Sequence, residues 1–197
     1  MPTKRFDMIA QDKRKMISEV IMNEFLDSPA GEVSMSRVAS KAKISRTSLY
    51  GYFEDKEDIQ QFALRVVVES LMEYNKNQLL ENYGDLWIAM ERTMQYYVSK
   101  CKKAPFLALQ LFQESQRDRV LFRDPGYEEY KNWLYEHVDK RRFRNPQRDK
   151  VNTLIEICQL LLIGSTLKAA CSQQSETDTI AEFKRQMELL KGQFEKD

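Results

Sequence analysis

Residues 34–53 read SMSRVASKAKISRTSLYGYF, and this stretch decides the fold of the N-terminal part of the chain. Its apolar residues predict two short helices, at 35–41 and 46–53, that turn one face toward a core. At about 100° of rotation per residue, Leu49 and Phe53 share a helix face, and the opposite side is small, polar and aromatic. Two such helices packed on a preceding one are typical of a helix-turn-helix, whose second helix enters the DNA major groove by its N-terminal residues.

The same stretch has an unusual distribution of charge. The whole chain is balanced, with 31 basic and 30 acidic residues, but residues 34–53 hold four basic side chains and no acid. A surface free of negative charge is what binding to phosphates requires. A chance fluctuation over so short a segment would give the same count, so the charge supports DNA binding only together with the helical pattern.

The residue types around the second helix suit contacts to DNA. Arg46 can hydrogen-bond to guanine, and the hydroxyl of Thr47 can reach a base edge or a phosphate. Ser34, Ser45 and Asp55 also stand where a side chain can cap the helix that follows. The alternative is that the serines only cap helices and the tyrosines only pack with a solvated hydroxyl. The predicted DNA-binding residues are Ser34, Ser36, Arg37, Lys43, Ser45, Arg46, Thr47, Ser48, Tyr50, Tyr52 and Lys56.

The rest of the sequence predicts an all-α protein, because glycine and proline are few and the alternating pattern of strands is scarce. Short helices give way to long ones near residues 82–85, and a helix that starts near Lys56 crosses this point. We predict a three-helix DNA-binding domain at residues 1–56 and a helical ligand-binding and dimerisation domain at 57–197. The expected helices lie at 11–26, 35–41, 46–53, 55–80, 85–103, 105–119, 125–142, 147–171 and 178–195.

Several classes of protein are excluded by composition. The longest strongly apolar run covers residues 160–163, far short of the ~20 residues of a membrane helix, and the N-terminus has no apolar secretory signal. Three scattered cysteines fit a reducing cytoplasm and neither a disulfide framework nor a zinc cluster. A single histidine, His137, and no phosphate-binding glycine loop give no basis for predicting a catalytic, metal or cofactor site.

The N-terminal part resembles the DNA-binding domain of the tetracycline-repressor (TetR) family of bacterial regulators, over about residues 10–64. The matching elements are the first-helix pattern ending in Phe25, Val38-Ala39, Ile44-Ser45, Leu49-Tyr50-Gly51-Tyr52-Phe53 and Lys56-Glu57-Asp58-Ile59. The resemblance implies that residues 45–48 read bases, whereas Ser34, Tyr50, Tyr52 and Lys56 hold phosphates. Lys43 departs from the family, which commonly has glycine there. We therefore expect a left-handed backbone at Lys43 that costs about 1 kcal/mol or more.

The last two predicted helices have apolar surfaces that could contact a second copy of the chain. The helix at 147–171 is apolar nearly all round between Leu154 and Ile163, and the helix at 178–195 has a regular apolar stripe. Both suit a homodimer interface, which the family builds as a four-helix bundle, and the alternative is that they only fill the monomer core. The predicted interface residues are Leu154, Cys158, Leu161, Ser165, Ile180, Phe183 and Met187.

Aromatic and methionine side chains between these regions predict a pocket for a hydrophobic small molecule. A stripe of this kind at helical spacing is also typical of a core. The predicted pocket residues are Trp87, Met90, Met94, Tyr97, Phe106, Phe112, Tyr130 and Trp133.

These patterns together predict a cytoplasmic, sequence-specific transcriptional regulator that binds double-stranded DNA. The expected form is a homodimeric, ligand-responsive repressor on a palindromic operator, with no membrane attachment. One alternative with the same fold is a nucleoid-associated DNA-binding protein without an effector. A helical enzyme or a protein-interaction module is the alternative from another class, and the acid-free segment with Arg46-Thr47-Ser48 disfavours it.

Overall fold

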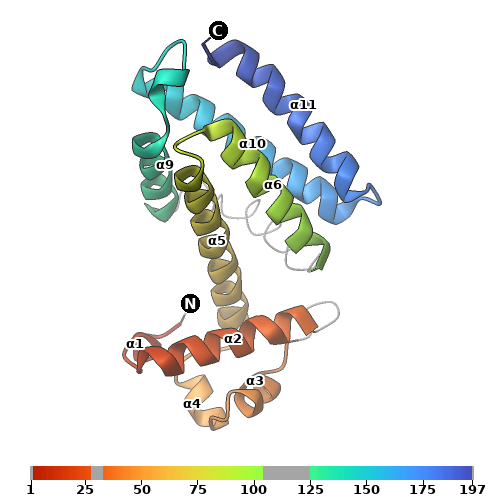
Figure 1. Ribbon diagram of the computed structural model, residues 1–197. Coiled ribbons are helices and arrows are strands. Elements are labelled where there is room, and N and C mark those ends of the chain that lie inside the picture. The colour runs from red at the N-terminus through yellow and green to blue at the C-terminus, as the bar shows by residue number, and fades with distance from the viewer. Residues whose placement is uncertain (1, 28–32, 104–124, 197) are drawn as a thin grey trace. The chain divides into compact units, whose positions relative to one another are not determined.

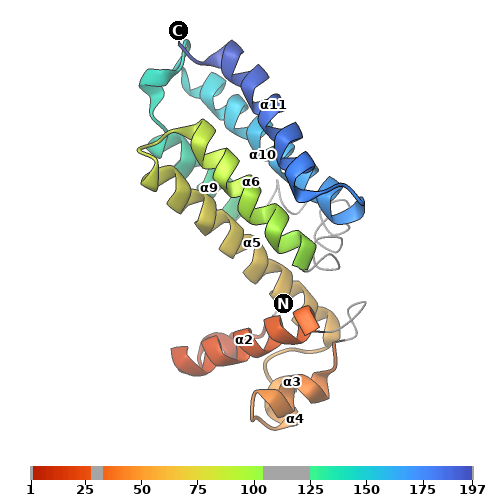
Figure 2. The same cartoon turned by 45° about the vertical axis from the view of Figure 1, so that its right-hand side comes forward.

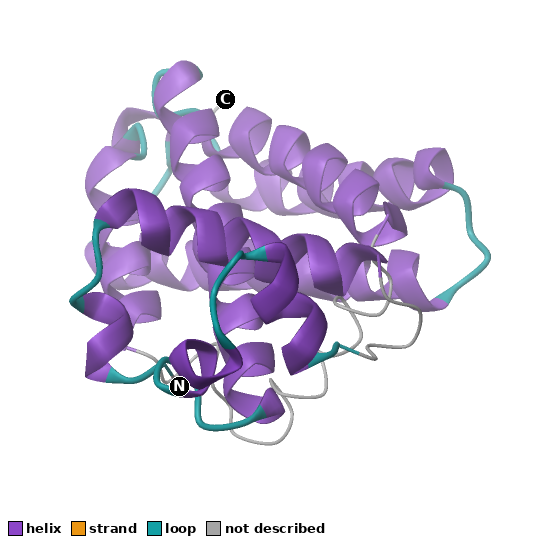
Figure 3. Ribbon diagram, turned by 90° about the horizontal axis from the view of Figure 1, so that it is seen from below, coloured by secondary structure: helices purple, strands orange, loops and turns teal. Residues whose placement is uncertain are grey.

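The structure is a computed structural model that describes residues 2–27, 33–103 and 125–196. Contacts divide the chain into two compact units, unit 1 (Met1–Glu69) and unit 2 (Ser70–Asp197). The division falls inside one long helix, α5 (Lys56–Glu81), to which both units contribute. The described residues contain no strand beyond one isolated bridge between Phe143 and Glu195 (Figure 3). The all-α class predicted from the sequence is therefore confirmed.

Unit 1 begins with a short helix that the sequence analysis did not predict and continues with the predicted ones. The bounds are α1 (Lys4–Asp7), α2 (Gln11–Asp27), α3 (Met35–Lys41) and α4 (Arg46–Tyr50), followed by the first part of α5 (Figure 1). Helix α4 ends at Tyr50 rather than at Phe53, because Gly51 takes the C-cap position.

Two of the three predicted side-chain caps form. The hydroxyl of Ser45 accepts a 3.0 Å hydrogen bond from the backbone N–H of Ser48, which starts α4. The carboxylate of Asp55 accepts a 2.8 Å bond from the N–H of Asp58, which starts α5. Ser34 holds the N-cap position of α3 with an extended backbone, but its side chain makes no cap hydrogen bond. The prediction that the Ser34 side chain caps α3 is therefore wrong.

The core of unit 1 is built on the apolar stripe predicted for α2. Ile17, Ile21 and Phe25 are buried, and so are Leu49 and Phe53 from the second half of the helix-turn-helix. Buried Val38 and Ala39 of α3 complete the contact between the short helices. This packing turns the remaining faces of α3 and α4 toward solvent.

Unit 2 contains the long helices predicted for the C-terminal part. Their bounds are α6 (Leu86–Lys103), α9 (Pro125–His137), the 3₁₀ turn η2 (Lys140–Arg142), α10 (Arg148–Cys171) and α11 (Glu176–Phe194). The helix expected at 125–142 is interrupted after His137, where η2 forms instead. The helix expected at 105–119 lies outside the described residues.

Helix α10 is the centre of unit 2. It packs against α6, α9 and α11, and α6 also packs against α11, so that α6, α10 and α11 run side by side (Figures 1 and 2). By length and composition α10 could cross a membrane, although the sequence analysis found no apolar run of that length. Its contacts with three neighbouring helices bury part of this apolar surface, including Leu154 and Leu162, whereas Leu160 stays exposed.

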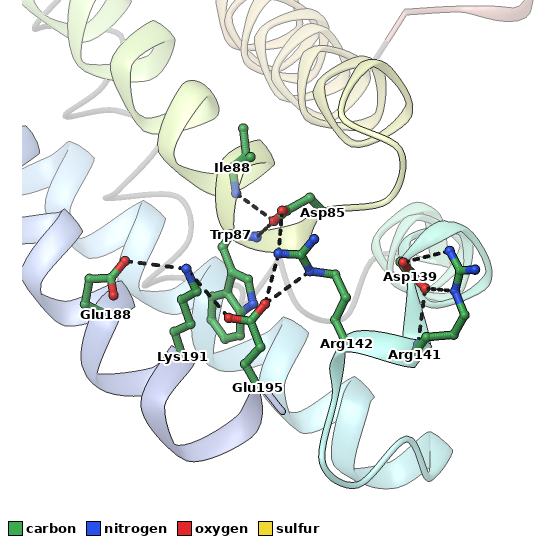
Figure 4. A network of polar contacts seen from close by, with 9 residues as sticks. All are labelled: Asp85, Trp87, Ile88, Asp139, Arg141, Arg142, Glu188, Lys191 and Glu195. Atoms are coloured by element: carbon green, nitrogen blue, oxygen red, sulfur yellow. Dashed lines mark hydrogen bonds and ion pairs between the residues drawn. The ribbon is translucent and has the colours of Figure 1, made fainter. Parts of the chain in front are cut away.

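A network of polar contacts closes one end of unit 2 (Figure 4). Gly84 has a φ of 80°, and its carbonyl accepts a 2.9 Å hydrogen bond from the N–H of Asp139. The carboxylate of Asp85 caps the start of α6 and lies 2.9 Å from the guanidinium of Arg142. Arg142 also lies 3.0 Å from the carboxylate of Glu195. One arginine thus joins the start of α6 to the end of α11.

Candidate nucleic-acid interface

Helix α4 presents its first turn to solvent. Leu49 is fully buried and fixes the orientation of the helix, whereas Arg46 and Thr47 are exposed and Ser48 is half-buried. The Ser45 and Ser48 hydroxyls lie 2.9 Å apart. Ser45 caps α4 and is also one of the predicted DNA contacts. An N-terminal helical turn with exposed arginine and hydroxyls is suited to reading base edges.

Arg46 is connected to the preceding helix. Its guanidinium donates a hydrogen bond to the hydroxyl of Ser36 on α3. An arginine fork has several N–H donors, so this bond leaves others that can reach a guanine. The structure therefore brings two of the predicted DNA-binding residues together.

The turn between α3 and α4 depends on Lys43. Its φ is 52°, in the left-handed region, as expected for a lysine where the family commonly has glycine. The N–H of Lys43 donates to the carbonyl of Ser40, and the N–H of Ile44 donates to the carbonyl of Ala39. These bonds satisfy the last carbonyls of α3, in the manner of a left-handed helix C-terminus. The exposed lysine side chain adds positive charge to the same surface.

Arg37 and Lys41 form ion pairs with a carboxylate that the sequence analysis did not single out. Glu24 of α2 contacts Arg37, and its second oxygen lies 2.9 Å from the ammonium of Lys41. Burial by itself would raise the pKa of Glu24, but the hydrogen bonds and charges of Arg37 and Lys41 outweigh it and hold the pKa below its ordinary value. Glu24 lies in the buried stripe of α2, three residues after Ile21. An acid at an apolar position of the stripe was the sequence feature that could have predicted a buried ion pair.

The two tyrosines predicted to hold phosphates are placed differently. Tyr50 is 50% exposed, whereas Tyr52 is only 4% exposed and packs its ring 5.8 Å from that of Phe6. Lys56 is exposed at the start of α5, and Ser34 is half-buried. Tyr50 and Lys56 thus offer more surface to a phosphate backbone than Tyr52 does.

A second candidate site lies in unit 2, where the structure brings together most of the predicted pocket residues. Trp87, Met90, Met94, Tyr97 and Tyr130 are buried in one apolar cluster, and Trp133 packs against that cluster half-buried. The predicted pocket residues Phe106 and Phe112 lie outside the described residues. The lone His137 stacks on Trp133, and its Nδ1 lies 2.8 Å from the Trp133 carbonyl oxygen.

A chain of neutral polar side chains crosses this cluster. Gln159 donates a 3.2 Å hydrogen bond to the hydroxyl of Tyr130, which donates a 2.6 Å bond to the side-chain carbonyl of Asn75. The Asn75 amide donates a 2.7 Å bond to the hydroxyl of Thr93, which donates to the carbonyl of Ala89. Burial raises the pKa of Tyr130 well above its ordinary value, so its hydroxyl stays neutral.

Asn75, Thr93 and Gln159 were not predicted from the sequence as members of this site. Gln159 interrupts the apolar run of α10 between Cys158 and Leu160, and this lone amide was the available signal. Buried polar groups of this kind need hydrogen-bond partners. Together with Tyr130, these three side chains bond to one another across α5, α6, α9 and α10.

The predicted interface residues fall into two groups. Leu154, Cys158, Phe183 and Met187 are buried inside unit 2 of the single chain. Leu161, Ser165 and Ile180 are half-buried at its surface. The outward faces of the same helices carry Leu160, which is 54% exposed, and Leu189, which is 75% exposed.

Comparison with known proteins agrees with this fold. Residues 17–61 match the sequence profile of a family described as bacterial regulatory proteins, tetR family. No curated protein sequence matches the chain. A solved TetR-family protein from Mesorhizobium loti MAFF303099 has a TM-score of 0.67 at 12% identity, with 94% of this chain and 98% of that one covered.

Two further structures cover nearly the whole chain. The TetR-family repressor AlkX from Dietzia sp. strain DQ12-45-1b, implicated in biodegradation of n-alkanes, has a TM-score of 0.61 at 10% identity, with 91% and 95% covered. The dihydroxyacetone kinase operon activator DhaS has a TM-score of 0.60 at 14% identity, with 95% and 100% covered.

These findings show that the chain has the fold of TetR-family regulators, with the helix-turn-helix of a DNA-binding domain at its N-terminal end. The N-terminal helix-turn-helix is the part that matches the tetR family of bacterial regulatory proteins, over residues 17–61.

Proposed function

We propose that the protein is a cytoplasmic, homodimeric repressor that binds a palindromic operator and releases it when a small hydrophobic effector binds. Residues 1–56 carry DNA binding, and residues 57–197 carry dimerisation and effector binding. The mechanism is a population shift, in which the effector favours dimers whose recognition helices are badly spaced for the operator.

One observation carries the DNA-binding part of the proposal. The exposed first turn of α4, with Arg46 and Thr47, lies in a segment of 20 residues without an acid, and buried Leu49 fixes its outward orientation. Arg46 fits a base contact, whereas Tyr50 and Lys56 fit contacts to the sugar-phosphate backbone.

Selection of bound fragments from the organism's own DNA tests this assignment, followed by gel shifts on the selected site. Arg46→Ala should relax preference at one base pair in each half-site, by about 1–3 kcal/mol if the contact is bidentate. Lys56→Ala should weaken all sequences alike and reduce the salt dependence. If no fragment is enriched, or if both variants bind the selected site as tightly as the parent, the assignment is wrong.

Dimerisation is proposed through the outer faces of α10 and α11. Leu160 and Leu189 are exposed apolar side chains, and Gly164 and Gly192 have open space where a side chain would stand. Glycines on a helix surface let a neighbouring helix approach closely. Leu161, a half-buried member of the predicted interface, directly follows Leu160 on the same helix. A two-fold dimer would match inverted half-sites in the operator.

Light scattering on charge variants tests the dimer. Leu160→Glu and Leu189→Glu should each shift the protein toward a monomer and lower operator affinity, because each places a charge in the contact. Ile88→Glu is the matched control, since Ile88 is exposed at 44% but lies on α6. A stable monomer in the parent that still protects a palindrome would refute the proposal.

The effector is proposed to bind at the apolar cluster around Tyr130. The cluster offers methionine and aromatic surface, and the buried side chains that bond to the Tyr130 hydroxyl, Asn75 and Gln159, are neutral. The ammonium of Lys76 lies at the edge of the cluster, 5.4 Å from the Trp133 ring. We therefore infer an uncharged, amphipathic effector with a hydroxyl or carbonyl group, since an ion would be poorly solvated there.

Titration with uncharged hydrophobic compounds should change the fluorescence of Trp87 or Trp133 and release operator DNA over the same concentration range, as reciprocal coupling requires. A nucleoid-associated protein without an effector is the second candidate. Fluorescence that never responds, together with DNA binding spread over many unrelated sites, would favour it.

A further inference from the structure

The N-terminal segment is fastened to the end of the recognition helix. The backbone N–H of Thr3 donates a 2.8 Å hydrogen bond to the carbonyl of Tyr52. The Thr3 hydroxyl donates a second 2.8 Å bond to the carbonyl of Gly51. Both acceptors directly follow α4, so the path of residues 3–7 is set by the helix that is proposed to read DNA. The family profile begins only at residue 17 and does not include this segment.

A buried aromatic side chain anchors the other side of the same segment. Phe6 is 1% exposed, and its ring centroid lies 5.1 Å from that of Phe53 and 5.3 Å from that of Phe62. It also packs edge-on against Tyr52. Helix α1 is therefore part of the folded unit and holds its other side chains in defined positions.

Two basic side chains lie between these anchors. Lys4 and Arg5 are both exposed. The Nη1 atom of Arg5 lies 3.0 Å from the position that a Cβ of Gly51 would take, so the missing side chain of this glycine lets the guanidinium rest against the end of α4. The neighbouring residue, Tyr50, is half-exposed and is itself proposed to contact phosphate.

We propose that Lys4 and Arg5 contact the DNA phosphate backbone beside the recognition helix, which enlarges the DNA-binding surface beyond the helix-turn-helix. Arg5 lies at the end of α4 opposite to Arg46. Since a recognition helix enters the groove by its N-terminal residues, groups at its other end face the backbone and not the base edges. The contact is therefore independent of sequence and depends on charge. This inference rests on the proposed DNA-binding function.

Salt-dependent binding of the full chain to the selected operator and to an unrelated duplex provides the test. The double variant Lys4→Ala/Arg5→Ala should weaken binding to both duplexes by the same factor, roughly tenfold or more near 100 mM salt. The slope of log K against log salt should become shallower by about 0.9 for each phosphate that the variant no longer neutralises. The proposed DNA-binding function is tested separately. It holds if the parent binds the selected operator and Arg46→Ala loses base preference, whatever the double variant does.

Lys15→Ala is the matched control. Lys15 is exposed on α2, and at about 100° per residue it lies about 160° from buried Ile17, so this variant removes one charge from the outer face of unit 1. It should leave the slope unchanged. The inference fails if the double variant behaves like Lys15→Ala while Arg46→Ala still loses base preference. It also fails if the double variant changes the preferred sequence, because that would indicate a base contact. Thermal unfolding of each variant should match the parent, since both side chains are exposed.

Discussion

The ammonium of Lys41 on α3 lies 2.9 Å from the carboxylate of Glu24 on α2, although the Glu24 side chain is only 1% exposed. Arg37 pairs with the other oxygen of the same carboxylate. One buried acid thus holds the first helix of the helix-turn-helix against the longer helix behind it. Two of the four basic side chains of the acid-free segment are therefore paired with an acid of the protein itself. Arg37 positions α3 in addition to its predicted contact with DNA.

Glu24→Gln should lower the free energy of unfolding of the helix-turn-helix unit by about 1–2 kcal/mol at pH 7, because two ion pairs are replaced by bonds to an uncharged amide. The partners Lys41 and Arg37 are half-exposed, which keeps the effect below that of a fully buried pair. Thermal unfolding measures the change. Glu19→Gln, at an exposed position of the same helix, is the control and should have little effect.

The same pair predicts a pH dependence. The folded protein holds the pKa of Glu24 below its ordinary value of 4.5, so the ionised form is stabilised by folding. This stabilisation is complete above pH 4.5 and is lost as the pH falls through the lower pKa of the folded state. The difference in stability between the parent and Glu24→Gln should therefore be constant from pH 7 to about pH 5 and should shrink below 4.5. A difference that grows in acid would contradict the assignment.

Local rules predicted much of unit 1 from the sequence, and tertiary contacts explain the failures. The caps at Ser45 and Asp55 follow from neighbouring residues, whereas the left-handed turn at Lys43 was implied by the family resemblance, and the structure has all three. The role of Glu24 depends on a helix in another part of the sequence, although its place in the apolar stripe of α2 was visible. The docking of Arg5 beside Gly51 had no local signal, because it depends on the packing of Phe6 and on Thr3.

In unit 2 the bounds of α6, α10 and α11 were predicted to within two residues, but the end of α9 and the polar interior were not predicted. The helix expected at 125–142 stops at His137, because the next residues bend to let Asp139 bond to Gly84. The hydrogen bond between Tyr130 and Gln159 could not be predicted, because the sequence does not show which helices pack together. The division between exposed Leu160 and buried Cys158 likewise depends on the neighbours of α10.

Lys43→Gly should raise the free energy of unfolding of unit 1 by about 0.5–1 kcal/mol. Relief of the left-handed strain is worth about 1–2 kcal/mol, and the greater flexibility of glycine in the unfolded chain offsets part of it. The variant should also bind DNA less tightly at low salt, because a charge near the backbone is lost. Lys43→Ala removes the same charge and keeps the strain, so it separates the two effects. Equal unfolding temperatures for the glycine and alanine variants would show that Lys43 is not strained.

Gly84→Ala should destabilise unit 2 by about 2–3 kcal/mol. The residue has a φ of 80°, and a Cβ there would lie 2.7 Å from both the N of Asp139 and the carbonyl oxygen of His137. Strain in the backbone and the close contact therefore act together. Tyr83→Asn is the control, because Tyr83 also has a positive φ of 55° but is exposed, and asparagine tolerates that conformation. The asparagine variant should unfold at the parental temperature or above it, and an unchanged alanine variant would be inconsistent with the turn described.

Tyr130→Phe should separate effector response from DNA binding. The substitution removes the hydroxyl that donates to Asn75 and accepts from Gln159, and it leaves two buried polar groups without that partner. Unit 2 should lose about 1–3 kcal/mol of stability, and operator affinity without effector should stay at the parental value, since unit 1 is untouched. If the effector bonds to the hydrogen-bonded side chains around Tyr130, a higher effector concentration should be needed to release DNA from this variant than from the parent.

Tyr135→Phe makes the same chemical change on the same helix at a half-buried site, where the ring packs under Lys140 and Arg148. The measurement compares operator release by both variants over one titration of uncharged hydrophobic compounds. A selective loss of response in Tyr130→Phe supports an effector whose polar group meets the buried chain. If both variants release DNA at the same effector concentration as the parent, the polar chain only stabilises unit 2, and the effector binds elsewhere.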